Sequence, residues 1–283
     1  MKAISVFLLA ALAASATAAA ADERQGASEI SLNLELDSRE YVSGERIRGV
    51  LGVVNASTET LHGNGTGAPD RLFLEAKRES DKSDLSRISS APFTVRFAID
   101  PSRRQDFEIF AERHFDFMRE TRYLVRPVLV HGKTRYEGAW RSFSVVPGMK
   151  LAESVQLFSN VEGLRRDLTL VYWGRNRLEH LFLKIRDTSP EGPFIHPTID
   201  LGPIMRVTAP KISISPSGEA TILWRTNQDY FARAVYWSLP KVFEHHKTES
   251  LVDPDIAGST ALRDRYKSDE PLKPAKQSWW RFW

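Results

Sequence analysis

The sequence predicts an all-β protein, and two features of the chain carry that prediction. Residues 30–36 read Ile-Ser-Leu-Asn-Leu-Glu-Leu, so apolar and polar side chains alternate strictly. A period of two is typical of a strand with one buried face and one wet face. Similar short segments recur along the chain, separated by stretches rich in glycine, proline and polar residues. Short strands at such intervals indicate antiparallel sheets packed face to face.

The first half of the chain contains most of the clear strand patterns. After residues 30–36 and a turn at Tyr41–Glu45, we predict strands over 47–57, 71–77, 92–99, 122–130 and 141–146. The segment 107–118 fits two interpretations, because its apolar side chains match both helical spacing and strand alternation. We expect a short helix or an irregular crossover there. Its aromatic residues, among them Phe107, Phe110 and Phe115, are expected to fill the core.

Four short motifs relate this first half to known domains: Leu32-x-Leu34-x-Leu36, Tyr41-x-x-Gly44-Glu45-x-Ile47, Val53-x-Asn55-x-Ser57 and Thr121-x-Tyr123-x-Val125. Through them, residues 30–147 resemble the immunoglobulin-like and macroglobulin-like β-sandwich domains of exported proteins. The resemblance implies one antiparallel sandwich, with a tyrosine corner at Tyr123 late in the fold. It carries over no functional residue.

The second half, residues 151–254, is expected to form another small antiparallel β domain after a linker at 146–150. Candidate strands lie at 155–158, 168–173, 180–186, 211–215, 220–224 and 231–238. Ser215–Glu219 reads Ser-Pro-Ser-Gly-Glu and predicts a tight turn, with glycine taking the positive φ. The five prolines of 190–210 predict a long connection with short extended pieces. The second half resembles no family that its motifs identify.

The N-terminus has the pattern of a cleavable signal peptide over residues 1–21. Lys2 precedes an apolar run from Ile4 to Leu12, and small alanines precede Asp22. We expect cleavage after Ala20 or Ala21, a flexible segment 22–29, and a periplasmic or extracellular mature protein. The chain has no cysteine, so an exported form cannot use disulfides and must be stabilised by its packed cores.

The last segment, residues 255–283, differs in composition and is expected to be flexible. From Ile256 onward it carries six basic and three acidic residues, is poor in aliphatic side chains, and ends Trp279-Trp280-Arg281-Phe282-Trp283. Clustered aromatics beside basic residues suit a membrane surface or a groove on a partner protein. They also suit an apolar patch on the protein's own domains, and the sequence leaves these three uses open.

The sequence offers no catalytic, metal or cofactor motif. None of the seven histidines forms a zinc-type pair, and no nucleophile elbow or phosphate loop is present. No long basic stripe suggests nucleic acid as a partner. Sequence does not exclude a pair of carboxylates for glycoside hydrolysis. Asp37, Glu40 and Glu45 lie together at a turn. We interpret them as solvated acids of a turn.

Three tryptophans of the second half have two interpretations. Trp173, Trp224 and Trp237 lie on predicted strands, and exposed together they could stack on sugar rings. Their strands also carry apolar companions, such as Ile222 on the same face as Trp224, which favours the core.

The sequence therefore favours a non-catalytic, extracytoplasmic binding or scaffolding protein of the cell envelope, with an unidentified protein or glycan partner. The alternative is a carbohydrate-binding protein or a component of a glycan-processing system, for which the tryptophans are the support. A hydrolase whose active site is assembled from distant segments is a third class that sequence does not exclude.

Overall fold

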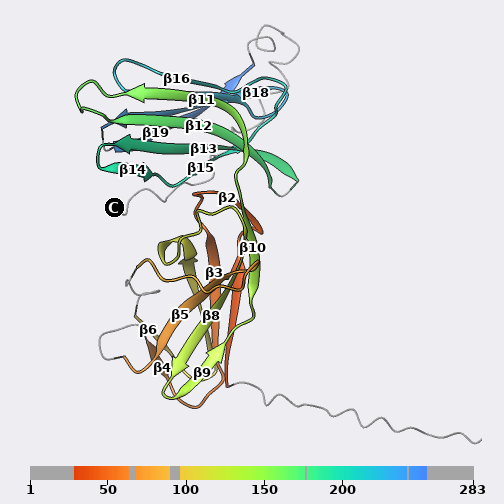
Figure 1. Ribbon diagram of the computed structural model, residues 1–283. Coiled ribbons are helices and arrows are strands. Elements are labelled where there is room, and N and C mark those ends of the chain that lie inside the picture. Colours follow the sequence, from red (N-terminus) through yellow and green to blue (C-terminus); the bar gives the residue numbers. More distant parts are fainter. Residues whose placement is uncertain (1–28, 64–67, 90–95, 176, 241, 254–283) are drawn as a thin grey trace, which may run out of the picture.

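The computed structural model describes residues 29–63, 68–89, 96–175, 177–240 and 242–253, which form two packed groups of β-sheets, one above the other in Figure 1. The sheets are antiparallel apart from one short parallel pair, and the described helical content is a single 3-10 turn, Ala111–Arg113. The all-β prediction is confirmed. The signal-peptide prediction and the terminal Trp279–Trp283 prediction fall outside these residues. No described helix is long and apolar enough to cross a membrane.

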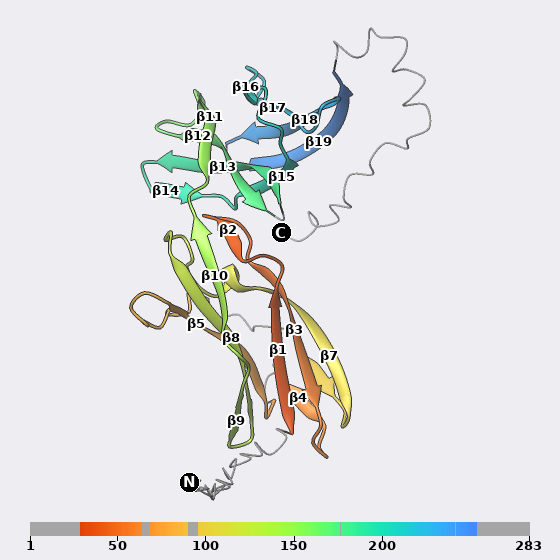
Figure 2. The ribbon, with the colours of Figure 1, turned by 90° about the vertical axis from the view of Figure 1, so that its right-hand side faces the viewer.

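Residues 30–146 form what we call the first sandwich, in which two sheets face each other (Figure 2). One sheet has the order β1 (Ile30–Leu36), β3 (Arg48–Asn55), β7 (Arg103–Phe110). The facing sheet has the order β2 (Glu40–Val42), β10 (Arg141–Val146), β8 (Arg122–His131), β5 (Arg71–Arg78), and β9 (Thr134–Glu137) pairs with β8. A short pair joins β4 (Leu61–Gly63) to β6 (Phe97–Ile99).

Alternating side chains from both sheets build the core of the first sandwich. In β1 the polar and apolar positions separate as predicted, with Ile30 and Leu34 almost fully buried. Opposite them lie Tyr123 and Phe143, whose stacked rings are 5.6 Å apart. The hydroxyl of Tyr123 donates a hydrogen bond of 2.8 Å to the carbonyl of Arg119, which confirms the predicted tyrosine corner.

The chain changes sheets between β1 and β2, and this crossing shapes the region described below. β1 runs antiparallel to β3, whereas β2 pairs in parallel with the end of β10, from Ser144 onward. Tyr41 anchors the crossing from inside the core, where its hydroxyl donates to Asp37 at 2.5 Å. Burial, together with this carboxylate, raises the pKa of Tyr41 far above its usual value.

Residues 149–252 form the second sandwich, again from two sheets. One contains β11 (Met149–Leu157), β12 (Arg165–Arg175), β13 (Leu178–Ser189) and β14 (Gly192–Ile195), with β15 (Ile199–Pro203) also paired to β13. The other has the order β16 (Lys211–Ile214), β17 (Glu219–Arg225), β18 (Tyr230–Leu239), β19 (Val242–Val252). A separate core cluster joins them, including Leu170, Leu183, Ile222 and Tyr236.

Several local expectations need correction. Residues 107–110 belong to strand β7, so the helix expected there is wrong up to Phe110, and only the 3-10 turn follows. The segment forms a strand because alternate side chains, those of Phe107 and Ile109, are buried in the core. The expected linker 146–150 is shorter than predicted, since β11 begins at Met149. The turn at Ser215–Glu219 is confirmed, with Gly218 at φ +84.

Candidate functional site

The second sandwich meets the first along residues 37–45, from the end of β1 to just beyond β2, and this segment holds the three acids singled out in the sequence. Asp37 and Glu40 are exposed, as expected for a solvated turn. Glu45 is not, because its side chain is only 9% exposed. The expectation of solvation is therefore wrong for Glu45, and the reason is that the second sandwich packs over it. We call this contact region the junction, formed by residues 40–45 with β12, β13 and residues 198–200.

Arg175, at the end of β12, is the central charge of the junction. Its guanidinium donates to Glu45 at 2.7 Å and to Asp200 at 3.1 Å, and His180 lies 3.1 Å from Asp200. Burial raises the pKa of Glu45, and the hydrogen bond from Arg175 opposes that rise. Burial alone would lower the pKa of Arg175, but Glu45 and Asp200 hold it above its usual value. Arg175 therefore stays charged, whereas burial disfavours the charged form of the Glu45 carboxylate.

Backbone contacts complete the junction. Thr198 donates its N–H to the carbonyl of Gly44 and its hydroxyl to the carbonyl of Ser43, both at 2.8 Å. A Cβ at Gly44 would lie 2.8 Å from the Thr198 hydroxyl, and Gly44 has φ +85, so glycine is required on both counts. Beneath them Val42 packs against Val171 and Phe182. The junction is thus a built interface with an apolar base and a charged rim.

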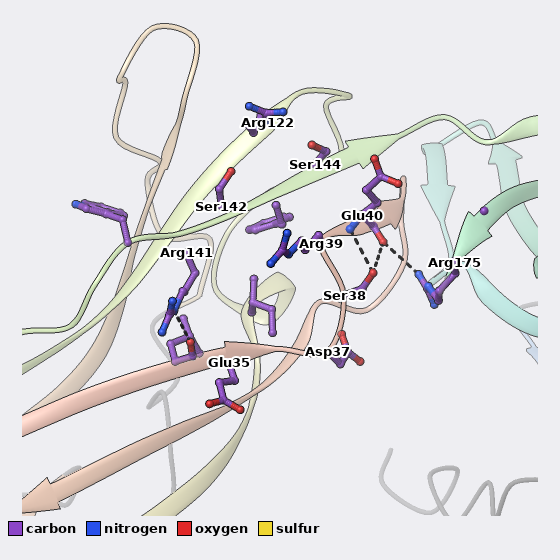
Figure 3. A pocket seen from close by; sticks show the side chains of 15 residues that line it. Glu35, Asp37, Ser38, Arg39, Glu40, Arg122, Arg141, Ser142, Ser144 and Arg175 are labelled. Atoms are coloured by element: carbon purple, nitrogen blue, oxygen red, sulfur yellow. Dashed lines mark hydrogen bonds between the residues drawn. The ribbon is translucent and has the colours of Figure 1, made fainter. Parts of the chain in front are cut away.

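Beside the junction a groove opens between the edges of the two sheets of the first sandwich, and it has a volume of about 1080 Å³. Figure 3 shows its walls, with β1 and the turn on one side and β10 with Arg122 on the other. The charged side chains that line it are four arginines and three acids: Arg39, Arg122, Arg141, Arg175, Glu35, Asp37 and Glu40. Serine hydroxyls and Trp140 add to a lining that is largely polar.

The polar groups of the groove differ in how far the protein already uses them. Arg141 bridges the two walls by donating to the Leu34 carbonyl and to Asn33, both at 2.8 Å. Glu40 accepts a hydrogen bond of 3.0 Å from the indole of Trp173. Within the described part of the chain, no hydrogen bond or ion pair engages the exposed guanidinium of Arg39 or the hydroxyl of Ser142. Side-chain groups without a partner in the groove therefore include the hydroxyl of Ser142 and the cation of Arg39.

Arg122, on the far wall, adds a second accessible cation. Its side chain is 62% exposed and its ion pair with Glu79 is a long one, at 3.3 Å. Trp140 also lines the groove, and its ring lies under Lys77 and Arg126, at 4.1 Å and 4.5 Å from the ring centroid. These contacts place two cations over the ring of Trp140.

The structure separates the three tryptophans proposed for glycan contact. Trp224 is 3% exposed, and its indole donates to the Pro203 carbonyl at 3.1 Å, so it is part of the core. Trp173 lies at the junction through its bond to Glu40. Trp237 is 36% exposed and contacts His246. They do not form one platform, and a glycan contact of Trp173 or Trp237 stays a prediction.

A second polar cluster lies inside the second sandwich, and sequence analysis missed it. Arg166 is fully buried and donates two hydrogen bonds to Asp187, at 2.6 and 2.7 Å. It also donates to the hydroxyl of Ser238 at 3.0 Å, and Asp187 contacts His196 at 2.9 Å. Because its hydrogen bonds are internal and Arg166 is closed to solvent, this cluster joins β12 and β13 to β18 and offers no ligand site.

Sequence reasoning also missed the groove, because no local pattern marks it. Arg39, Arg122 and Ser142 come from three segments that only the sheet topology brings together. The one signal available was the cluster Asp37, Glu40 and Glu45, which points to the correct turn. Among the residues that the structure describes, no group of three or more histidines and acids is placed to hold a metal ion.

Comparison with known proteins gives no family. No family model matches the chain, and no curated protein matches it. Among solved structures, the crystal structure of Spo0M, a sporulation control protein from Bacillus subtilis, aligns over 80% of this chain and 90% of its own, at 10% identity and a TM-score of 0.28. At that TM-score the likeness is too low to assign a shared fold or function.

Proposed function

We propose that this chain is an exported, non-catalytic binding protein of the cell envelope or the extracellular space, and that the groove beside the junction is its ligand site. The observation that carries the proposal is the open polar groove whose accessible donors, Arg39 and Ser142, have no partner among the described residues. Polar donors that converge on a concave surface are what a binding site offers to a hydrophilic ligand. The N-terminal pattern of residues 1–21 supports export.

The lining of the groove supports binding rather than acid–base chemistry. Asp37 accepts a hydrogen bond from Tyr41, and Glu40 accepts one from Trp173. Both carboxylates are therefore already held by side chains of the protein itself. No histidine is among the residues that line the groove. A cationic, hydroxyl-bearing wall of this kind favours a ligand with anionic groups.

We also propose that the first sandwich is an immunoglobulin-like domain. Its support is the change of sheet between β1, which is antiparallel to β3, and β2, which is parallel to β10. The tyrosine corner at Tyr123 adds to it. In this interpretation the groove lies at the side of the sandwich where the chain crosses from one sheet to the other.

The second candidate function is carbohydrate binding, and one observation favours it. Trp140 lines the groove together with carboxylates and arginines, a mixture that can both donate to and accept from sugar hydroxyls. This places a glycan in the groove, away from Trp224 and Trp237. The cations already over the Trp140 ring make it the weaker of the two candidates.

A binding panel tests the proposed function. Fluorescein-labelled polyglutamate, labelled alginate oligosaccharides and labelled neutral cellooligosaccharides are titrated against the mature protein by anisotropy. We expect at least one probe to bind, and Arg39→Glu with Arg122→Glu to weaken it at least tenfold. The matched control is Arg104→Glu, an exposed arginine of β7 that pairs with Asp106 away from the groove. Equal binding by both variants would show that the groove is not the site.

A further inference from the structure

Two strand edges face the groove, and their peptide groups follow from the hydrogen bonds of their neighbours. In β10, Ser144 donates its N–H to the Arg39 carbonyl at 2.9 Å, whereas Val145 donates to Thr121 on the opposite edge. Successive residues of a strand point to alternate edges, so Ser142 faces the same side as Ser144. β2 begins its pairing with β10 only at Ser144. The N–H and C=O of Ser142 therefore face the groove.

β1 presents the second edge. Asp37 donates its N–H to Arg48 of β3 at 3.1 Å, so the odd-numbered residues of β1 face β3. Leu34 and Leu36 consequently face the other way, toward the groove. The Leu34 carbonyl is taken by Arg141, at 2.8 Å, and no described residue pairs with Leu36 on that side. Two partly unpaired strand edges thus line one groove, which Figure 3 shows with β1 below and β10 above.

We propose that this groove takes an extended, acidic segment of another polypeptide, which adds as a strand between the edges of β1 and β10. Main-chain hydrogen bonds to Leu36 and Ser142 would hold the segment, as in other strand-addition complexes. Its acidic side chains would meet Arg39 and Arg122, the accessible cations of the lining. The inference rests on the proposed function and names the class of partner.

Charge and backbone chemistry favour an acidic peptide over two other occupants, the protein's own C-terminal segment and a glycan. The protein's own residues 256–283 carry six basic and three acidic residues, so like charges would oppose their entry beside Arg39 and Arg122. A glycan has no peptide groups to pair in register with strand edges. An acidic peptide satisfies both the open backbone groups and the unused cations.

The direct test uses a labelled ten-residue peptide of alternating glutamate and valine, titrated against the full mature chain by anisotropy. We expect binding that weakens with salt. The same peptide with alternate amides N-methylated keeps its charge but loses the backbone donors, and should bind at least tenfold more weakly. Equal affinity of the two peptides would overturn strand addition, and preferred binding of alginate oligosaccharides would replace the peptide by a glycan.

Variants of the protein distinguish the contribution of the Ser142 backbone N–H to peptide binding from that of its side chain. Ser142→Pro removes the N–H that faces the groove without removing a bond to β8, and should weaken the peptide at least tenfold. Ser142→Ala is the matched control, since it removes the side-chain hydroxyl but keeps the N–H, and it should weaken the peptide much less than Ser142→Pro does. If Ser142→Pro fails to fold, the N-methylated peptide decides the question alone.

A chain ending at residue 253 that binds the peptide much more tightly than the full chain would identify the basic tail as the natural occupant and overturn the proposal. Loss of all probe binding on Arg39→Glu, with no effect of N-methylation, would retain the ligand site and reject only the strand.

Discussion

Two arginines near opposite ends of strand β12, Arg166 and Arg175, differ in burial and in how completely their hydrogen bonds are satisfied. Arg166 is fully buried inside the second sandwich and donates to Asp187, Ser238 and the carbonyls of Leu239 and Val242. Arg175 lies at the junction with 14% of its side chain exposed, and its Nε has no hydrogen-bond partner. Each is paired with a carboxylate, but the surroundings are different.

The difference appears in the carboxylates. Burial alone would raise the pKa of Asp187, but the hydrogen bonds from Arg166 and His196 lower it. The pKa of Glu45 is raised by burial despite the bond from Arg175. The interior pair is therefore fully compensated, and the junction pair is not. The compensated pair joins strands within the second sandwich, whereas the under-compensated pair joins the two sandwiches.

The largest expected effect is at Arg166. Arg166→Met leaves Asp187 buried with only His196 as a charged partner, and breaking a buried pair of this kind costs about 3–5 kcal/mol of unfolding free energy. Urea denaturation followed by circular dichroism measures the loss. The matched control, Arg166→Met with Asp187→Leu, removes both charges and should recover most of it. A single variant as stable as the wild type would contradict the compensation described for this cluster.

A smaller effect is expected at Arg175. Arg175→Met removes the partner of Glu45, but Glu45 already has a raised pKa and can take up a proton, which limits the cost to about 1–3 kcal/mol. The same change should broaden the range of angles between the two sandwiches, which small-angle X-ray scattering detects as a larger radius of gyration. An unchanged scattering curve would mean that Thr198 and the apolar base hold the junction without the charges.

The pH dependence sharpens the comparison further. Because the pKa of Glu45 is higher folded than unfolded, the folded chain binds more protons between those two values, and stability must fall as pH rises through that interval. Asp187 acts in the opposite direction, since its lowered pKa adds stability as pH rises toward 3.8 and beyond. The unfolding free energy, measured between pH 4.5 and 7, should therefore fall less steeply with rising pH in Glu45→Gln than in the wild type. Identical slopes would contradict the burial of Glu45.

How far the sequence predicts these features depends on whether the signal is local. The alternation of residues 30–36, the turn at Gly218 and the tyrosine corner at Tyr123 are local patterns, and all three were predicted correctly. Val242–Val252 was not predicted as a strand, because its exposed edge position allows a polar sequence. Neither arginine cluster was predicted, since Arg166 and Asp187 lie 21 residues apart and meet only through strand pairing. The groove depends likewise on the crossing between sheets.

The smallest effect is expected where an arginine pair lies on the surface. Arg206 donates to both oxygens of Glu179 at 2.6 Å and lies over the ring of Tyr172. It therefore makes the same two-bond contact with a carboxylate that Arg166 makes with Asp187. Its side chain is nevertheless 43% exposed, and water competes for both charges. Arg206→Gln should therefore lower the unfolding free energy far less than Arg166→Met does, and less still in high salt. A loss as large as that of Arg166→Met, measured by the same urea titration, would show that hydrogen-bond geometry rather than burial sets the contribution of each arginine in this protein.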